Sequence, residues 1–118
     1  MKNKRLLSTN LFDNNNNEIF EDDVINIYFD YTKDKNNNIR YMLNKNGESY
    51  ITAKVIFKDN AFRINVINIS YKADDGCKIN LNNILSSQFE NSIITKEMIK
   101  SCVIIDTNKG ENNEKWIS

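Results

Sequence analysis

Apolar residues recur at every second position through the middle of the chain, and this alternation restricts the fold more than any other feature. The first set is Ile25, Ile27, Phe29 and Tyr31. A strand with one buried and one wetted face has this period of two. The alternation breaks at Lys33, and the polar run 32–38 is typical of a loop. Ile39 to Leu43 can return as a second strand, so the sequence predicts a hairpin with a long loop.

A second hairpin is predicted after the turn-forming residues 44–47. In its first strand, polar Thr52 and Lys54 alternate with the apolar residues Ile51, Ala53, Val55 and Phe57. The polar residues 58–60 separate this strand from a second one, which contains Phe62, Ile64 and Val66. Beyond Val66 the apolar phase moves by one position, to Ile67, Ile69 and Tyr71. One extra residue in the alternation indicates a β-bulge at this point.

The C-terminal third carries weaker signals. Residues 79–89 fit either a short strand or a helical turn. Thr95 can cap a single helical turn over 96–100, and 102–105 is apolar enough for a closing strand. We expect residues 1–8 and 109–118 to be loose termini, with Trp116 either docked on the body or free.

Together these signals indicate one mainly β domain over residues 1–118. Several short strands, frequent turns and little helical periodicity favour a small antiparallel barrel or pseudo-barrel of the SH3-like kind, with one short helix. A chain of this length buries only a modest core.

Composition narrows the classes of function. Lys plus Arg is 16 and Asp plus Glu is 16, so the net charge favours no polyanionic partner. His is absent and Cys77 lies far from Cys102, so the usual zinc sets cannot form, and we expect no metal and no cofactor. Both cysteines are expected to be small buried side chains. No apolar run is long enough for a membrane span or a signal peptide, which predicts a cytoplasmic protein.

Two motifs stand out, at residues 9–25 and 53–64. The first reads Thr-Asn-Leu-Phe-Asp-Asn-Asn-Asn-Asn-Glu-Ile-Phe-Glu-Asp-Asp-Val-Ile, two tight turns leading into a strand. The second places Asp59, Asn60 and Phe62 at the centre of a strand, a turn and a strand. Over residues 9–69 these motifs resemble the YopX-like phage protein family. The first motif resembles the family signature Thr-Gly-Leu-x-Asp-x-Asn-Gly-x-Glu-Ile-Tyr-Glu-Gly-Asp-Ile-Val.

The departures from the family pattern fall mainly on glycines. The three glycines of the signature become Asn10, Asn16 and Asp22, and the glycine of the second motif's turn becomes Asn60. Asn and Asp are the non-glycine residues that most readily accept positive φ, so the backbone can keep its shape. The resemblance implies a phage or prophage origin, a β-barrel-like fold and no established enzymatic activity. It also implies that the cytoplasm is that of the infected host cell, and it transfers no catalytic residue.

The acidic residues of the first motif have two readings. Glu21, Asp22 and Asp23 could hold a metal or exchange a proton, but in a turn before a strand such side chains usually bond to backbone N–H groups. We favour this structural role for them and for the turn residues Asn10, Asn16, Asp59 and Asn60. The run 13–18 begins like a calcium loop but lacks the central glycine and the final glutamate.

We therefore hypothesise a non-enzymatic phage accessory protein that binds a host or phage protein and modulates a host or defence process. The expected contact residues lie in and beside two loops, and they are Lys33, Lys35, Arg40, Tyr41, Lys72, Asp74 and Asp75. The alternative is a barrel that binds single-stranded nucleic acid. Its binding residues would be Lys33, Lys35, Arg40, Tyr41, Lys54, Lys58 and Arg63, beside Tyr28, Tyr31 and Tyr50. Homo-oligomer formation through the strand edge at Ile39 to Leu43 is compatible with both hypotheses.

Overall fold

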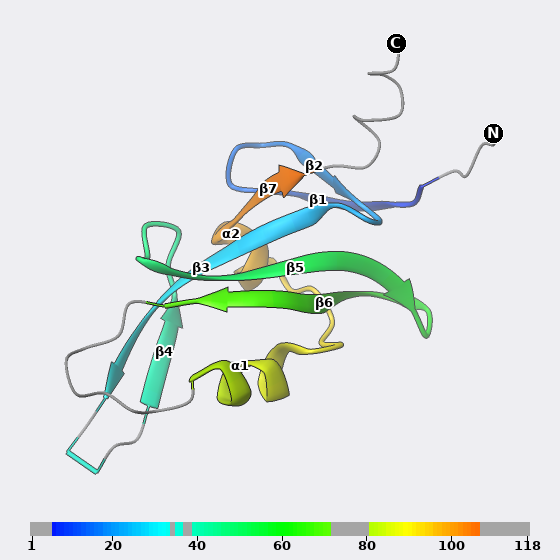
Figure 1. Cartoon of the computed structure of the whole chain (residues 1–118). Helices are drawn as coiled ribbons and strands as arrows, with labels where there is room; N and C mark the ends of the chain where they lie inside the picture. The colour runs from blue at the N-terminus through cyan, green and yellow to red at the C-terminus, as the bar shows by residue number, and fades with distance from the viewer. Residues whose placement is uncertain (1–5, 34, 37–38, 72–80, 107–118) are drawn as a thin grey trace.

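A computed structural model of the chain describes residues 6–33, 35–36, 39–71 and 81–106, without the side chains at 33, 39, 81 and 82. Seven strands and two helices follow one another within these ranges (Figure 1). They are β1 Ser8–Phe12, β2 Glu18–Phe20, β3 Val24–Lys33, β4 Ile39–Leu43, β5 Ser49–Lys58, β6 Ala61–Ser70, α1 Leu81–Phe89, α2 Lys96–Lys100 and β7 Cys102–Asp106.

The main sheet is antiparallel, and β3 lies at its centre. Its order is β4-β3-β5-β6, and β7 also pairs with β3. Tyr28 shows that β7 and β4 share one edge of β3, because its N–H donates to the Ser101 carbonyl and its carbonyl accepts from the Asn44 N–H. β7 thus covers the first half of that edge and β4 the second half.

The β1–β2 hairpin forms a separate two-stranded sheet, and the two sheets do not close into a barrel within the described residues. The mainly β, antiparallel character of the fold is as predicted. Closure into an SH3-like barrel is not seen, because the segment 91–94 lies along the outer edge of β6 where a further strand would have to pair. The Ile64 N–H donates to the Ser92 carbonyl, and the Ile94 N–H donates to the Phe62 carbonyl.

The core lies between one face of the main sheet, the hairpin and the two helices. Alternating residues of β3 and β5 are fully buried, as the sequence pattern predicts. Leu85 and Phe89 of α1 and Met98 of α2 complete the core from the helical side. Each fully buried aliphatic side chain contributes about 1.5–3 kcal/mol through removal of apolar surface from water.

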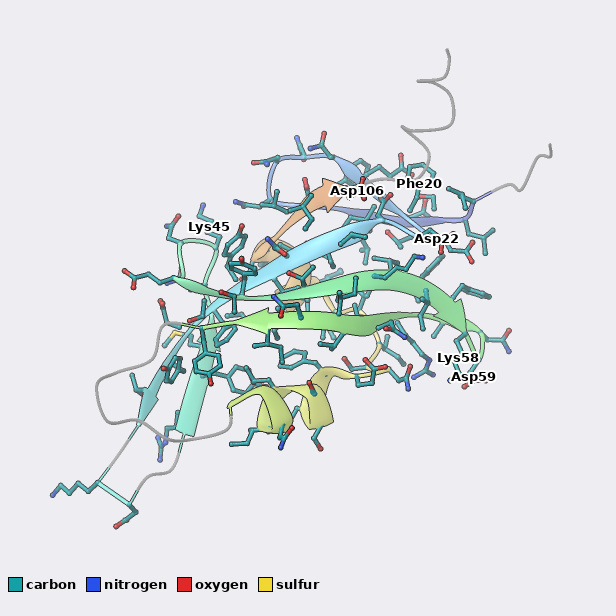
Figure 2. All side chains as sticks on the ribbon, viewed as in Figure 1. Phe20, Asp22, Lys45, Lys58, Asp59 and Asp106 are labelled. Atoms are coloured by element: carbon teal, nitrogen blue, oxygen red, sulfur yellow. The ribbon has the colours of Figure 1, made fainter. Side chains whose placement is uncertain are left out.

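The predicted β-bulge is present in the β5–β6 hairpin. Thr52 pairs with Asn68 and Ala53 pairs with Val66, so Ile67 is the extra residue. At the tip of this hairpin, Asp59 and Asn60 both have positive φ, of 53° and 61°. Two left-handed residues in a two-residue loop define a type I′ turn, whose twist suits the flanking strands. Lys58 and Asp59 mark this tip in Figure 2.

The helical region partly departs from the sequence prediction. α2 and its cap are as predicted, since the Thr95 hydroxyl accepts a hydrogen bond from the Met98 N–H. The predicted closing strand is β7. The ambiguous segment 79–89 contains a helix, α1, so the structure has two helices where the sequence predicts one. β1 begins at Ser8, inside the terminus expected to be loose, while Cys77, Trp116 and 109–118 lie outside the described residues.

Left-handed backbone occurs at each of the four positions where the two motifs carry Asn or Asp in place of a glycine in the family that they resemble. The φ angles are 61° at Asn10, 67° at Asn16, 73° at Asp22 and 61° at Asn60. Asn10 lies at the irregularity in the β1–β2 pairing, and Asp22 lies in the turn that leads to β3. Asn and Asp tolerate this conformation better than other residues with a side chain. Asn91, with φ of 63° just after α1, was not singled out in the sequence.

Gly47 marks a chain crossing between the two edges of β3. The chain leaves β4 opposite Phe29 and enters β5 on the other side of Phe29. A Cβ atom on Gly47 would lie 2.3 Å from the Phe29 carbonyl oxygen and 2.8 Å from its nitrogen. Only a residue without a side chain lets the two backbones approach so closely.

Candidate binding site

The β3–β4 arm is the part of the sheet that projects furthest from the core, at the lower left of Figure 1. It consists of residues 30–33 and β4, with 35–36 in the loop between them. β5 pairs with β3 only as far as Phe29, so beyond that point β3 pairs with β4 alone. A two-stranded ribbon attached to a rigid sheet can present side chains without disturbing the core.

Tyr41 anchors the arm to the rest of the molecule. Its ring centroid lies 6.5 Å from that of Phe29, edge-on, and 5.6 Å from that of Phe89 in α1. Aromatic pairs at these separations are favourable by about 0.5–1.5 kcal/mol beyond the area that they bury. The side chain is nevertheless 37% exposed, so Tyr41 is both a structural contact and an accessible surface.

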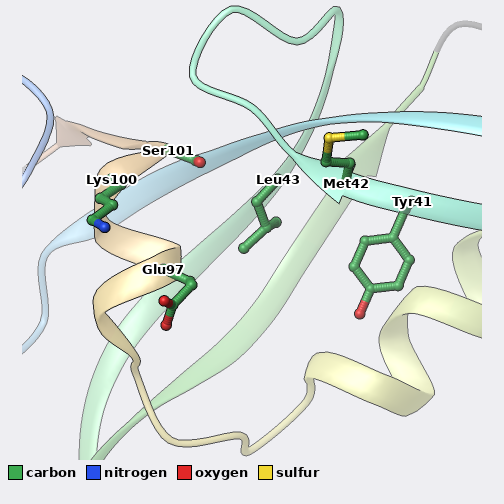
Figure 3. Close-up of a pocket in the computed structure, with 6 residues that line it drawn as sticks. All are labelled: Tyr41, Met42, Leu43, Glu97, Lys100 and Ser101. Atoms are coloured by element: carbon green, nitrogen blue, oxygen red, sulfur yellow. The ribbon is translucent and has the colours of Figure 1, made fainter.

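A pocket of about 480 Å³ lies between β4 and α2 (Figure 3). Tyr41 and Leu43 point to the helical side of β4, whereas Met42 points away. The wall opposite is formed by α2 and the residue after it, through Glu97, Lys100 and Ser101. The pocket therefore combines an apolar strand with one acidic and one basic side chain.

A smaller pocket of about 190 Å³ lies between β3 and β4. Its lining includes Asp30, Thr32, Arg40 and Met42. The Asp30 carboxylate accepts hydrogen bonds from the Asn44 side-chain amide at 2.7 Å and from the Glu48 N–H at 3.2 Å, which ties it to the β4–β5 turn. Arg40 is exposed, and Met42 is 71% exposed. Arg40 and Met42 are thus an accessible cation and an accessible apolar side chain two positions apart on β4, so they lie on the same face of the ribbon.

The structure groups part of the predicted binding set on the arm. Arg40 pairs with Thr32, Lys33 belongs to β3, Lys35 is exposed in the loop, and Tyr41 lines both pockets. The predicted residues Lys72, Asp74 and Asp75 lie outside the described residues. Sequence reasoning missed Glu97 and Lys100, because only the fold brings α2 next to β4. It predicted the strand that contains Met42 and Leu43 but did not single out these two residues as contacts.

The Asp13 side chain is committed to the backbone at the opposite end of the molecule. One carboxylate oxygen accepts from the N–H groups of Asn15 and Asn17 at 2.9 and 2.8 Å, and the other accepts from the Ile104 N–H at 2.9 Å. These bonds shape the β1–β2 turn and attach it to β7. Asp13 is only 5% exposed and its carboxylate binds backbone N–H groups, so the segment 13–18 forms a turn and does not present its oxygen atoms as a calcium loop does.

The acidic cluster before β3 likewise organises a turn. The fully buried Asp23 carboxylate accepts from the Phe20 N–H at 2.8 Å, and the Glu21 carboxylate lies 3.4 Å from the Leu7 N–H. The Asp22 N–H donates to the Val55 carbonyl. These backbone contacts are those expected of turn residues. No group of three or more His, Cys, Asp or Glu side chains within the described ranges could hold a metal ion.

Cys102 is buried at the start of β7. Burial, with a smaller contribution from the nearby Asp13 carboxylate, raises the pKa of its thiol from 9.0 to about 12. A thiol with a raised pKa carries almost no thiolate at neutral pH and is a poor nucleophile. Cys102 therefore acts as a small buried side chain, as the sequence predicts.

The face of the sheet opposite the core carries two of the three tyrosines proposed for nucleic-acid binding, whereas the third, Tyr31, packs against the core. Tyr28 and Tyr50 are directly paired across β3 and β5, with ring centroids 5.5 Å apart. Lys54 follows on the same face of β5. Arg63 contributes less than the sequence suggested, because its guanidinium donates to the carbonyls of Lys58 and Asn91, at 3.0 Å each.

No protein-family model, curated protein or solved structure matches the chain. Within the described residues, no helix has the length and apolar character needed to cross a membrane.

Proposed function

We propose that this chain is a non-enzymatic binding module of phage or prophage origin, and that its β3–β4 arm engages a host or phage protein. The observation that carries the proposal is the concentration of accessible Arg40, Tyr41 and Met42 around two pockets on a projecting ribbon. Interfaces are enriched in arginine, tyrosine and methionine, and recognition residues commonly lie on extensions of a rigid scaffold.

The chemistry elsewhere supports binding over catalysis. Asp13 and Asp23, the most buried carboxylates of the first motif, accept hydrogen bonds from backbone N–H groups. The buried thiol of Cys102 has a raised pKa. The resemblance of residues 9–69 to YopX-like proteins supplies the phage context, and the modulation of a host or defence process is part of the same proposal.

Affinity purification from a susceptible host tests this function. The tagged chain is compared with the K35A/R40A variant and with K54A/K58A, which removes the same charge from another strand and its hairpin tip. We expect wild type and K54A/K58A to recover one stoichiometric protein that K35A/R40A loses. Equal recovery by all three, or recovery of no protein, contradicts the proposal.

Binding of single-stranded nucleic acid is the second candidate function, and the Tyr28–Tyr50 pair with Lys54 favours it. Stacking of bases on such rings contributes about 1–3 kcal/mol per base, and phosphate contacts make binding fall steeply with salt. A labelled oligonucleotide should then bind wild type at low salt and bind K54A with a shallower salt dependence. Absence of binding at low ionic strength eliminates this candidate.

A further inference from the structure

Among the residues that the structure describes, β4 pairs with β3 alone, so its outer edge is open there, and this pairing shows which backbone groups of β4 face outward. The Asn44 N–H donates to the Tyr28 carbonyl, so the backbone groups of Asn44 face β3. Every second residue of an antiparallel strand has the same orientation, so the N–H and carbonyl groups of Met42 and Arg40 also face β3. Tyr41 and Leu43 consequently direct their N–H and carbonyl groups away from β3. Proteins protect such edges with proline, charged side chains or a bulge, and of these β4 carries only the charged Arg40.

We propose that two copies of this chain associate through their β4 strands, paired antiparallel about a two-fold axis at Tyr41. A two-fold contact needs a strand that is complementary to itself. In this register Tyr41 opposes Tyr41 of the second copy, Leu43 opposes Ile39, and Arg40 opposes Met42. Apolar residues oppose apolar ones, and the single charge of the strand never opposes itself.

Charge also favours a second copy in this register. Met42 already pairs with Asp30 on β3. The antiparallel register places Arg40 of the second copy on the other side of Met42 and on the same face of the joined sheet. Each cross-strand row then reads acid, methionine, cation, and it occurs twice because of the symmetry. The exposed Met42 side chain would lie between two opposite charges instead of in water.

The pocket beside β4 leaves room for the added strand. Residues directly opposite one another point their side chains to the same face, so Tyr41 of the second copy points to the side of Tyr41 and Leu43, where the 480 Å³ pocket lies. Because the arm projects from the core, antiparallel pairing sends the two cores in opposite directions (Figure 1).

Sedimentation velocity of the purified chain, from about 1 to about 500 µM, tests the proposal. Wild type should form a dimer as concentration rises. M42K places a lysine opposite Arg40 of the second copy in both symmetric rows, and this repulsion should weaken the dimer about tenfold. M42E places a glutamate opposite the same arginine and should strengthen the dimer about tenfold. The double variant M42K/R40E reverses the order of charges and should restore wild-type association.

Met42 is largely exposed, so each variant should keep the wild-type circular dichroism spectrum and melting temperature at low concentration, which separates assembly from folding. A monomer at every concentration overturns the proposal. So does a dimer whose dissociation constant ignores the sign of the charge at Met42, because another surface must then carry the contact. The test involves no partner protein, and its result is independent of the proposed function.

Discussion

The two ends of β3 use polar residues in opposite ways. At the β1–β2 end, Asp13 and Asp23 are buried and every hydrogen bond described for their carboxylates runs to backbone N–H groups. At the β3–β4 arm, Arg40 is exposed beside an exposed methionine. The densest cluster of charged residues in the sequence, Glu21 to Asp23, thus organises a turn, so charge density along the sequence does not by itself indicate a binding site.

Removing the Asp13 carboxylate gives the strongest test of this difference. D13A leaves three backbone N–H groups, those of Asn15, Asn17 and Ile104, without their acceptor. A hydrogen bond to a charged group contributes about 1.5–3 kcal/mol, and water can partly replace the acceptor at the exposed residues Asn15 and Asn17, so we expect a loss of about 3 kcal/mol in the free energy of unfolding. Chemical denaturation measures it, with N15A as the matched control, since that exposed side chain can change while its N–H remains. A loss of under about 1 kcal/mol would show that the turn does not depend on Asp13.

Gly47 joins the core to the arm, and G47A is expected to have the next largest effect. The added methyl group would meet the Phe29 backbone at 2.3 Å, so one of the two chains has to move. We expect a loss of about 2–3 kcal/mol in unfolding free energy, by analogy with overpacked cores. Chemical denaturation of G47A measures this loss, and N46A, which changes an exposed neighbour in the same turn, is the control. Equal stability of the two variants contradicts a close backbone contact.

The left-handed turn at the β5–β6 tip should show a smaller effect whose sign depends on the residue. N60A places alanine at a φ of 61° and should cost about 1 kcal/mol. N60G, which creates the Asp-Gly pair preferred in type I′ turns, should be neutral or stabilising by a few tenths of a kcal/mol. Melting temperatures of N60A and N60G test this expectation, and an N60A variant more stable than N60G would contradict the turn assignment.

The pH dependence of stability should carry the signature of Cys102. Its pKa is raised in the folded state, so below pH 9 the thiol is protonated in both states and its contribution is fully present. As pH rises from 9 toward 12, the unfolded chain releases the proton and the folded chain retains it, so stability falls. Denaturation midpoints below pH 9 and at about pH 10.5 should show this fall, and C102A should show less of it. An identical pH profile in C102A would mean that the thiol is not the cause.

At the arm, the smallest stability effect is expected. R40A removes an exposed side chain, and substitutions of this kind usually change the free energy of unfolding by less than about 0.5 kcal/mol. Thermal unfolding of R40A beside wild type checks this. A loss comparable to that of D13A would place Arg40 among the structural residues and remove the contrast between the two ends.

Much of the sheet could be predicted from the sequence, because strand alternation and turn chemistry are local properties. The period of two in β3 and β5, the slip at Ile67 and the cap at Thr95 each lie within a few neighbouring residues. So do the left-handed asparagines and aspartates, since their conformation depends on short-range sterics. These features need no knowledge of what packs against them.

The open architecture and the larger pocket could not be predicted in the same way. The segment 91–94 lies along β6, and α2 lies beside β4, only after the chain has folded. α1 has a faint signal in the spacing of Leu85 and Phe89, and Asn91 is a reasonable residue to end a helix. That spacing is too short to separate a helix from a strand. The predicted residues on the arm were found as members of a loop and its return strand, but the α2 wall facing them has no local signature.

Partner binding by matched variants at the two ends of β3 tests the central claim most directly. K35A/R40A alters the arm, and N15A alters the exposed surface of the β1–β2 turn, and both should fold as wild type does. Quantified by affinity purification, the partner protein should be lost with K35A/R40A and retained with N15A. Retention by the arm variant together with loss by the turn variant would place the binding surface at the wrong end of the molecule and contradict the account.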